Sequence, residues 1–324
     1  MTSSLPREAR EAFDRFVTSE FTTVGNRRQP ITWPIIPFYE QGAPTIDVTT
    51  GIGYPKKADD AIRNPKVSLL FSDPTGSGLE RPAQVLVQGI AEVDDQNLER
   101  NAERYFHDSG VKLPETKKMH PPKPMRSMLG WYYTRIYVYV RPERVFIWRG
   151  GSAGSEPEIH DAHLDEVRSG HVEEPAEDHG APAPGGTPWD QRVDEMGRDY
   201  ETAAISWLAP DGFPLSVRLP IRVDADSRAI HLELEPNGLP LAEGRACLTV
   251  HRHEPNFAWQ SNFQVRGNLR NEGGGWKLVP TRLVGGFEVP KSAIGRSRTF
   301  ITRMLPYRRR AKRRISEAAS RHGG

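Results

Sequence analysis

The chain has 324 residues, about twice the ~150 of a typical domain, so its length favours two domains. Hydrophobic residues make up 36% and charged residues 27%, and no stretch reaches the roughly 20 apolar residues that a membrane-spanning helix needs, which excludes a membrane span. The 44 Lys and Arg nearly balance the 42 Asp and Glu, so a net charge of +2 indicates no acidic partner.

Glycine and proline are abundant, at 29 and 28 residues, which favours short strands and turns over long helices. Segments rich in β-branched and aromatic residues predict about five strands before residue 150, at 31–39, 45–50, 66–71, 83–93 and 134–140. Helices are expected at 7–19, at 57–63 and between 97 and 107. The sequence therefore predicts an all-β protein with minor helices.

The N-terminal residues lack the apolar run of a secretory signal, and the single cysteine, Cys247, cannot form an internal disulfide. A cytoplasmic protein is expected. Cys247 lies in an apolar, strand-like run, so we expect it to be buried as a small hydrophobic residue.

Residues 151–189 differ in composition from the rest of the chain. Up to residue 188 they hold nine acidic side chains, one basic one, five prolines and six glycines. This composition predicts a disordered or loosely packed linker. Its four histidines, His160, His163, His171 and His179, are interpreted as solvated rather than metal-binding.

The chain also resembles itself. A shift of 184 residues aligns 30–32 with 214–216 and 46–48 with 230–232, and shorter shifts align 87–89 with 265–267 and 142–145 with 280–283. We interpret residues 1–150 and 190–324 as two β-barrel copies joined by the acidic linker, the second one ending in a basic helix.

Residues 49–65 run from a strand through a glycine turn into a short helix. Gly51 and Gly53 allow backbone N–H groups to converge there, the helix N-terminus adds partial positive charge, and Lys56 or Lys57 can add a full one. Such a junction fits a phosphate, although it is neither a Walker loop nor a dinucleotide fingerprint. The alternative is a tight turn with two solvated lysines.

Residues 21–93 resemble the FMN-binding split-barrel proteins, the pyridoxamine 5′-phosphate oxidase-like superfamily that includes deazaflavin-dependent oxidoreductases. The motifs are 29–34, 46–50 and 63–67, with Lys57 eight residues before Pro65. The resemblance extends through 85–91 and 137–145, and more faintly to 203–289. It implies that Lys57 binds the phosphate of FMN or of the deazaflavin coenzyme F-420. Further candidate cofactor contacts are Trp33, Pro34, Thr49, Thr50 and Gln88.

Two of these assignments have structural alternatives: Trp33 as a core aromatic residue and Gln88 as a cross-strand hydrogen bonder. In the second copy Arg218 stands at the position of Pro34, no lysine corresponds to Lys57, and Glu235 would repel a phosphate. We therefore expect one cofactor site per chain. Since the family pairs two barrels as a homodimer, this chain is expected to be a monomeric pseudo-dimer or a homodimer.

Two further features allow other functions. His251 and His253 point the same way on one strand and could bind a metal or a haem iron, although a surface strand is the preferred interpretation. Residues 291–314 hold ten Lys or Arg and no acid, so they could bind nucleic acid or a membrane surface, or cover an anionic cofactor. A solvated helix, or one paired with the linker, is the simpler interpretation, so no nucleic-acid partner is expected.

The sequence therefore favours a flavin- or deazaflavin-dependent oxidoreductase that transfers hydride to or from a small organic substrate, with no assigned catalytic residue and no metal. The alternatives are a non-catalytic flavin- or haem-binding protein, and a structural or nucleic-acid-associated protein.

Overall fold

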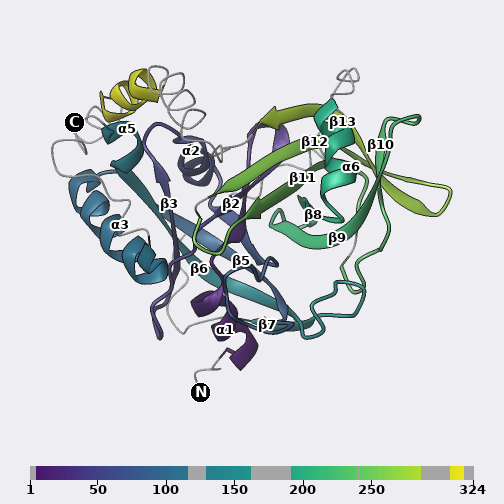
Figure 1. The fold of residues 1–324 in the computed structure, drawn as a ribbon, viewed down its shortest axis with the longest axis horizontal. Helices are drawn as coiled ribbons and strands as arrows, with labels where there is room; N and C mark the ends of the chain where they lie inside the picture. Colours follow the sequence, from purple (N-terminus) through teal and green to yellow (C-terminus); the bar gives the residue numbers. More distant parts are fainter. Residues whose placement is uncertain are drawn as a thin grey trace.

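The structure is a computed structural model that describes residues 5–115, 129–161, 191–239, 241–257, 259–285 and 307–316. Two β units lie side by side, the N-terminal one on the left of Figure 1 and the C-terminal one on the right. The remaining residues of the expected linker (162–189), and residues 291–306 of the basic segment, lie outside the described residues.

The first unit is an antiparallel sheet with the strand order β2-β1-β4-β5-β6-β3. Its strands are β1 (Ser19–Val24), β2 (Pro30–Ile35), β3 (Ile46–Gly51), β4 (Lys66–Phe71), β5 (Gln84–Asp94) and β6 (Arg135–Trp148), and β7 (Glu158–Asp161) pairs with β6. A two-residue bridge between Phe38 and Asp47 links the chain after β2 to the start of β3. This bridge brings the two end strands of the sheet together into a split barrel.

Helices lie at the rim of this barrel. They are α1 (Arg7–Arg15), the short η1 (Asn26–Arg28), α2 (Lys56–Arg63), α3 (Leu98–Lys112) and α5 (Gly130–Tyr133). A further helix over residues 307–316 lies beside α5 and α2 in Figure 1, in yellow.

The second unit is a closed barrel that repeats the first. Its strands are β8 (Thr202–Leu208), β9 (Pro214–Asp224), β10 (Ala229–Leu232), β11 (Gly244–His253), β12 (Gln260–Glu272) and β13 (Gly275–Gly285), preceded by α6 (Gln191–Asp199). The order β9-β8-β11-β12-β13-β10 matches that of the first sheet strand for strand. The expected fold, mostly β with two tandem split barrels, is therefore confirmed.

The two copies even share a backbone irregularity. In each, the register of the long hairpin shifts immediately before a glycine, Gly89 in β5 and Gly267 in β12, and that glycine faces a proline. A Cβ on Gly89 would lie 2.5 Å from the carbonyl oxygen of Arg141, and one on Gly267 would lie 2.3 Å from that of Val279. Only glycine permits this approach, which explains why the bulge can be recognised in both copies.

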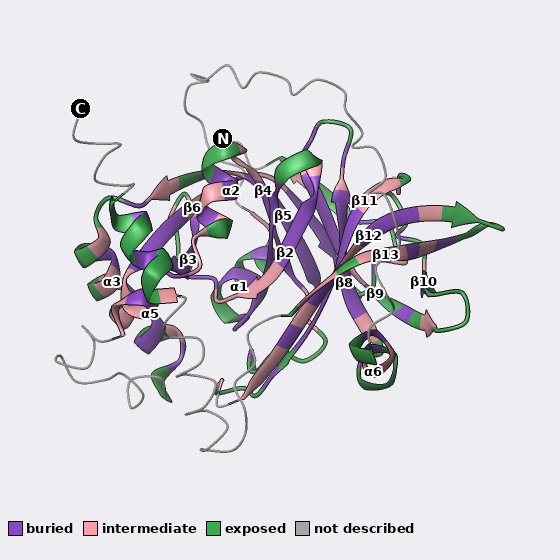
Figure 2. Cartoon of the chain, turned by 90° about the horizontal axis from the view of Figure 1, so that it is seen from above, coloured by how far each residue is buried: buried purple, intermediate pink, exposed green. Residues whose placement is uncertain are grey.

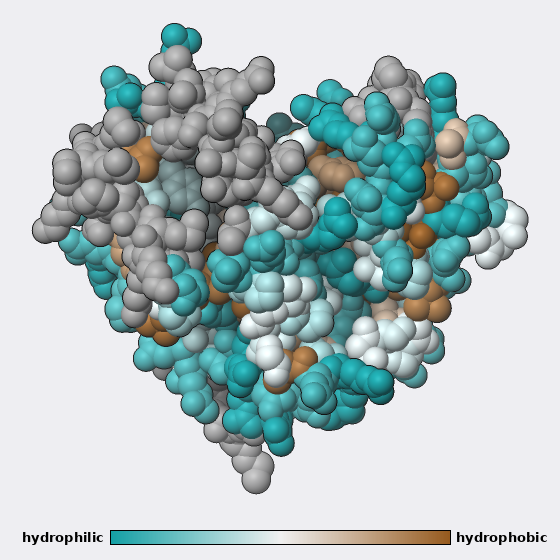
Figure 3. All heavy atoms as spheres, viewed as in Figure 1, coloured by the Kyte–Doolittle hydropathy of each residue, from teal (hydrophilic) through white to brown (hydrophobic). Residues whose placement is uncertain are grey.

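The hydrophobic core continues from one barrel into the other. Figure 2 shows buried residues along the central strands and exposed residues on the outer faces of the helices. Leu70, Leu86, Phe146 and Trp148 of the first copy belong to the cluster that fills the second barrel. The face drawn in Figure 3 is mostly hydrophilic where it is described, with hydrophobic residues in small, scattered groups. The two barrels thus pack as one body.

At the centre of the interface, four hydroxyl groups from equivalent positions meet. Thr22 and Thr32 come from the first copy, and Ser206 and Ser216 stand at the positions shifted by 184 residues. Their oxygens lie 2.7 Å (Thr32–Ser206), 2.8 Å (Ser206–Ser216) and 3.1 Å (Thr22–Ser216) apart. Because equivalent residues meet here, the contact marks the pseudo-two-fold axis that relates the barrels.

Away from this axis the interface is asymmetric. Arg218, which replaces the proline found at Pro34, pairs with the fully buried carboxylate of Glu20. Burial alone would raise the pKa of Glu20, but Arg218 and His251 lower it to about 2. The arginine that stands in the second copy at the position of Pro34 therefore supplies a buried ion pair between the barrels.

Some sequence expectations need correction. The segment 19–24 was not predicted as a strand, yet β1 is central to the sheet, and α1 ends at Arg15 rather than at residue 19. Glu20 and Thr22 of β1 are polar, so the segment lacks the apolar run that predicts a buried strand. Their partners, Arg218 and Ser216, lie nearly 200 residues away in the second barrel.

The first part of the predicted linker is ordered as β7, because its backbone pairs with the open edge of β6 and Glu158 forms an ion pair with Arg149. Within the parts of the chain that the structure describes, no helix is long and apolar enough to cross a membrane.

Candidate functional site

The predicted phosphate loop joins the end of β3 to the start of α2, as the sequence indicated. Thr49 and Thr50 are buried at the end of β3. The Thr49 hydroxyl donates to the Ile136 carbonyl, and the Thr50 hydroxyl to the Tyr54 carbonyl, each over 2.9 Å. Both hydroxyl groups are thus used in hydrogen bonds to backbone carbonyls that stabilise the loop and the strand end before it.

The two loop glycines allow close packing against α5. A Cβ on either Gly51 or Gly53 would lie 2.9 Å from a carbonyl oxygen, of Tyr132 and Trp131 respectively. The N–H of Gly53 donates to that Trp131 carbonyl. In this structure the glycines therefore hold α5 against the loop, and the Gly53 N–H is not directed to a ligand.

The two lysines of the loop have different surroundings. Lys56 is mostly exposed, and its amine lies 2.9 Å from Asp60, which also pairs with Arg63. Lys57 is half-buried and forms no ion pair or hydrogen bond with any described residue. Burial, with a smaller contribution from Arg135, lowers the pKa of Lys57 to about 8. Of the two candidates, Lys57 is thus the cation that lacks an anion.

Arg135 is the second cation of the site and was not among the contacts predicted from the sequence. It is the first residue of β6, and its register partner is Gly51 of the phosphate loop. Its guanidinium stacks on Tyr105 and Tyr132, 3.7 and 4.5 Å from the ring centroids. Its Nε is buried and has no hydrogen-bond partner among the residues that the structure describes. Only the pairing of β3 with β6 shows that Arg135 adjoins the loop.

Aromatic residues and the C-terminal helix cover the loop. Tyr307 packs 4.2 Å from Tyr54 and 5.4 Å from Trp131, measured between ring centroids. The same helix places buried Arg314 against Asp59 and Asp95, at 2.9 and 2.7 Å. The expectation that the basic segment is a solvated or linker-paired helix is therefore wrong for residues 307–316, which dock on the first barrel.

The other predicted cofactor contacts lie on strands that do not pair with β3 in the sheet order. Trp33 and Pro34 are partly buried on β2, the end strand that the Phe38–Asp47 bridge brings toward β3. Gln88 is fully buried on β5, where its amide donates to the Pro214 carbonyl of the second barrel over 3.0 Å. Within the described part of the chain, Gln88 Oε1 has no hydrogen-bond partner. Gln88 thus bonds across the barrels rather than across strands.

The corresponding loop of the second copy has no such cation. Leu241 stands where the first copy has Lys57, and Glu235 accepts a hydrogen bond from Trp276 over 3.1 Å. This loop carries a carboxylate and no lysine, so it lacks the positive charge that phosphate binding requires.

The two strand histidines are buried, with His251 at 4% and His253 at 8% exposure, so the preferred surface-strand interpretation is wrong. Both face the first barrel, because β11 lies in the interface and its alternate residues point to the same side. Cys247 on the same strand is buried and free, as expected.

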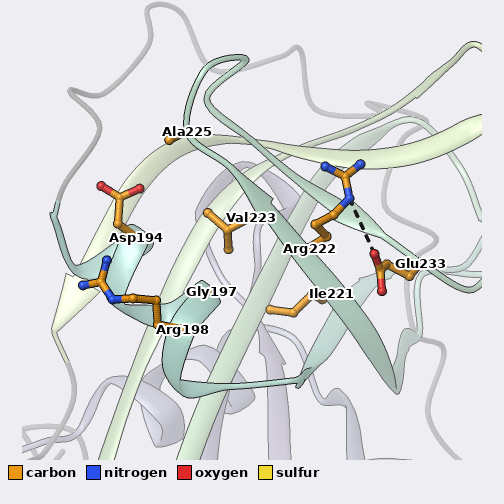
Figure 4. Close-up of a pocket in the computed structure, with 8 residues that line it drawn as sticks. All are labelled: Asp194, Gly197, Arg198, Ile221, Arg222, Val223, Ala225 and Glu233. Atoms are coloured by element: carbon orange, nitrogen blue, oxygen red, sulfur yellow. Dashed lines mark ion pairs between the residues drawn. The ribbon is translucent and has the colours of Figure 1, made fainter.

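A surface hollow of about 480 Å³ lies between α6, β9 and β10 of the second barrel. Figure 4 shows that charged side chains of both signs line it, including an ion pair between Arg222 and Glu233 at 3.5 Å. It contains none of the predicted site residues. A smaller hollow near Arg28 and Trp207 contains none either.

No protein-family model matches the chain, and no curated protein matches it. Solved structures do match about half of it. General Stress Protein 26 from Bacillus anthracis is 16% identical with a TM-score of 0.32, over 48% of this chain and 95% of its own. A putative pyridoxamine 5′-phosphate oxidase from Listeria innocua is 15% identical with a TM-score of 0.31, over 44% and 98%. An F420 reductase is 16% identical with a TM-score of 0.32, over 44% and 98%.

Proposed function

We propose that the first barrel binds the phosphate of FMN or of a deazaflavin through Lys57 and Arg135, and that the protein is an oxidoreductase acting on a small organic molecule. The observation that carries the proposal is the pair of cations at the loop, neither of which has a carboxylate partner among the described residues. Two such groups in a partly buried place repel each other, and a phosphate dianion would offset both charges.

The residues present fit a phosphate. Lys57 supplies a point charge, and Arg135 supplies a planar fork held in place by Tyr105 and Tyr132. The N-terminus of α2 begins at the same loop and adds its partial positive charge. Nearby Asp59 and Asp60 do not compete, because Arg314 pairs with the first and Lys56 and Arg63 with the second.

The flavin or deazaflavin ring supplies hydride transfer when it is bound. The chain's own residues position and shield it. The aromatic group of Tyr54, Trp131 and Tyr307 keeps water from the phosphate end of the site. The redox assignment itself rests on the resemblance of residues 20–149 to the split-barrel flavoproteins.

One site per chain is proposed, since the second copy has an acid in the equivalent loop. The second barrel then acts as the partner subunit of a homodimer would, and Gln88 and Arg218 hold it in place. On this basis the chain functions as a monomeric pseudo-dimer.

The absorption spectrum of the purified protein, after addition of FMN, coenzyme F-420 or haem, tests the proposal. We expect one flavin or deazaflavin per chain, and turnover with a reductant. A Soret band with no flavin uptake would contradict the proposal in favour of a haem protein. A colourless protein that takes up none of the three would contradict it in favour of a structural role.

A further inference from the structure

Three potential metal ligands meet where the barrels join, far along the sequence from the phosphate loop. Asp73 follows β4 of the first barrel, whereas His251 and His253 lie on β11 of the second. Asp73 Oδ2 is 3.5 Å from His251 Nδ1 and 3.7 Å from His253 Nε2, and the ligand atoms of all three lie within 4.8 Å of one another. Both histidines are more than nine-tenths buried.

Each imidazole is oriented by its other nitrogen. His253 Nδ1 lies 3.0 Å from the carbonyl oxygen of Glu254, which can only accept, so Nδ1 carries the proton and Nε2 keeps its lone pair. His251 Nε2 lies 2.7 Å from a carboxylate oxygen of Glu20. If it donates there, His251 Nδ1 keeps its lone pair toward Asp73. A carboxylate or carbonyl behind a ligating histidine is the usual outer shell of a metal site.

Asp73 is oriented in the same way. Its Oδ1 accepts the backbone N–H of Thr75 over 3.0 Å, which leaves Oδ2 facing the two histidines. Two nitrogen lone pairs and a carboxylate oxygen thus face one another in a largely buried place. Electron-rich atoms in such a place need a cation or a proton between them.

A proton-based arrangement is the competing explanation. Arg218 lies 2.9 Å from His251 Nε2, and if it donated there, His251 Nδ1–H would point at Asp73. However, the 3.5 Å between Nδ1 and Oδ2 exceeds a normal N–H···O bond, and the buried His251 Nδ1 has no hydrogen-bond partner in the described ranges of the chain. Arg218 and His251 Nε2 instead share the same Glu20 oxygen.

We propose that Asp73, His251 and His253 bind one divalent first-row transition-metal ion, and that this ion links the two barrels. Two imidazoles and one carboxylate form a donor set typical of Zn²⁺ and Fe²⁺. The distances of 3.5 and 3.7 Å from the Asp73 oxygen to the two histidine nitrogens are close to the roughly 3.3 Å between ligands that lie about 2 Å from a tetrahedral Zn²⁺. Three protein ligands leave a further coordination position. In the absence of a metal, the Thr18 hydroxyl lies 3.2 Å from His253 Nε2 and can hydrogen-bond to it.

The site is independent of the proposed cofactor function, since it shares no residue with the phosphate loop. Because one ligand comes from the first barrel and two from the second, a bound ion would stabilise their pairing. Binding to the folded state alone stabilises by RT ln(1 + [M]/Kd), which predicts a melting temperature that rises with metal concentration.

Zn²⁺ titration of the untagged, chelator-treated full chain tests the site, in competition with a chromophoric chelator. We expect one tight Zn²⁺ per chain. We expect His253→Ala and the isosteric Asp73→Asn to lose more affinity than the roughly 10–100-fold typical of a lost outer-shell partner. His231→Ala is the matched control, because His231 also lies near a carboxylate, Asp224 at 3.6 Å, but at a more exposed position, and it should bind as the wild type does.

Co²⁺ absorption provides a second readout, since a site with nitrogen and oxygen ligands gives visible bands that depend on the ligands. Wild type and His231→Ala should show the same spectrum, and Asp73→Asn should lose it. Absence of a tight Zn²⁺ in the wild type would overturn the proposal in favour of a metal-free ion-pair network. Equal affinities of wild type, His253→Ala and Asp73→Asn would overturn it as well.

Discussion

Replacement of Lys57 by methionine should have two opposite effects, one on cofactor binding and one on stability. Methionine keeps the apolar stem of the side chain and removes the ammonium group. The folded protein holds the pKa of Lys57 at about 8, against 10.5 for a free lysine, so the charged form is destabilising below pH 8. At 1.36 kcal/mol per pKa unit, this penalty is at most about 3 kcal/mol at pH 7, and less because the side chain is only half-buried.

The cofactor-free Lys57→Met protein should therefore unfold at a temperature a few degrees higher than the wild type at pH 7. The gain should shrink between pH 8 and 10.5, because the folded wild type loses its proton in this range while the unfolded chain keeps it. FMN binding should weaken about 10- to 100-fold, the equivalent of one hydrogen bond to a charged group. Calorimetric melting at pH 7 and pH 10 and a fluorescence titration measure the two effects.

Lys56→Met is the matched control for this experiment. Lys56 is one residue away, but it is exposed and paired with Asp60, so its loss should change stability by no more than about 0.5 kcal/mol and leave FMN binding unaltered. The reasoning would be refuted if the Lys57 and Lys56 variants behaved alike. It would also be refuted if Lys57→Met were destabilised and bound FMN normally.

Two further predictions concern the barrels and their interface. Gly267→Ala should destabilise the protein by about 1–3 kcal/mol in chemical denaturation, because its Cβ would lie 2.3 Å from a carbonyl oxygen of β13. Gly275→Ala is the control and should not destabilise it, because its Cβ would have no neighbour closer than 3.9 Å. Arg218→Met leaves the Glu20 carboxylate buried without its cation and should cost about 3 kcal/mol. Arg222→Met on the same strand removes only an exposed pair and should cost less than about 1 kcal/mol in the same assay, and equal losses would contradict the interface described above.

The repeated barrel was predictable because its signals are local. The bulge glycines and the prolines opposite them stand at equivalent places in the two copies, and short apolar runs mark most of the strands. The strand β1 was not predictable in this way. Glu20 and Thr22 are polar residues buried against Arg218 and Ser216, partners that no local pattern can indicate.

The phosphate loop was predictable as a segment, but its chemistry was not. Spacing could not separate Lys56 from Lys57, which differ because only the first has Asp60 as a partner. Arg135 joins the site through strand pairing, over more than 70 residues of sequence. The burial of His251 likewise depends on the second barrel docking on the first.

The central claim is tested most directly by measuring how much the phosphate group contributes to cofactor affinity. Fluorescence titration of the full chain with FMN and with riboflavin, which lacks the phosphate, measures it as a ratio of two dissociation constants. The account predicts that the wild type binds FMN at least about 10-fold more tightly, as expected for a charge-assisted contact, and that Lys57→Met loses most of this preference while its riboflavin affinity is unchanged. Equal affinities of the wild type for FMN and riboflavin, or a preference for FMN that Lys57→Met retains in full, would contradict it.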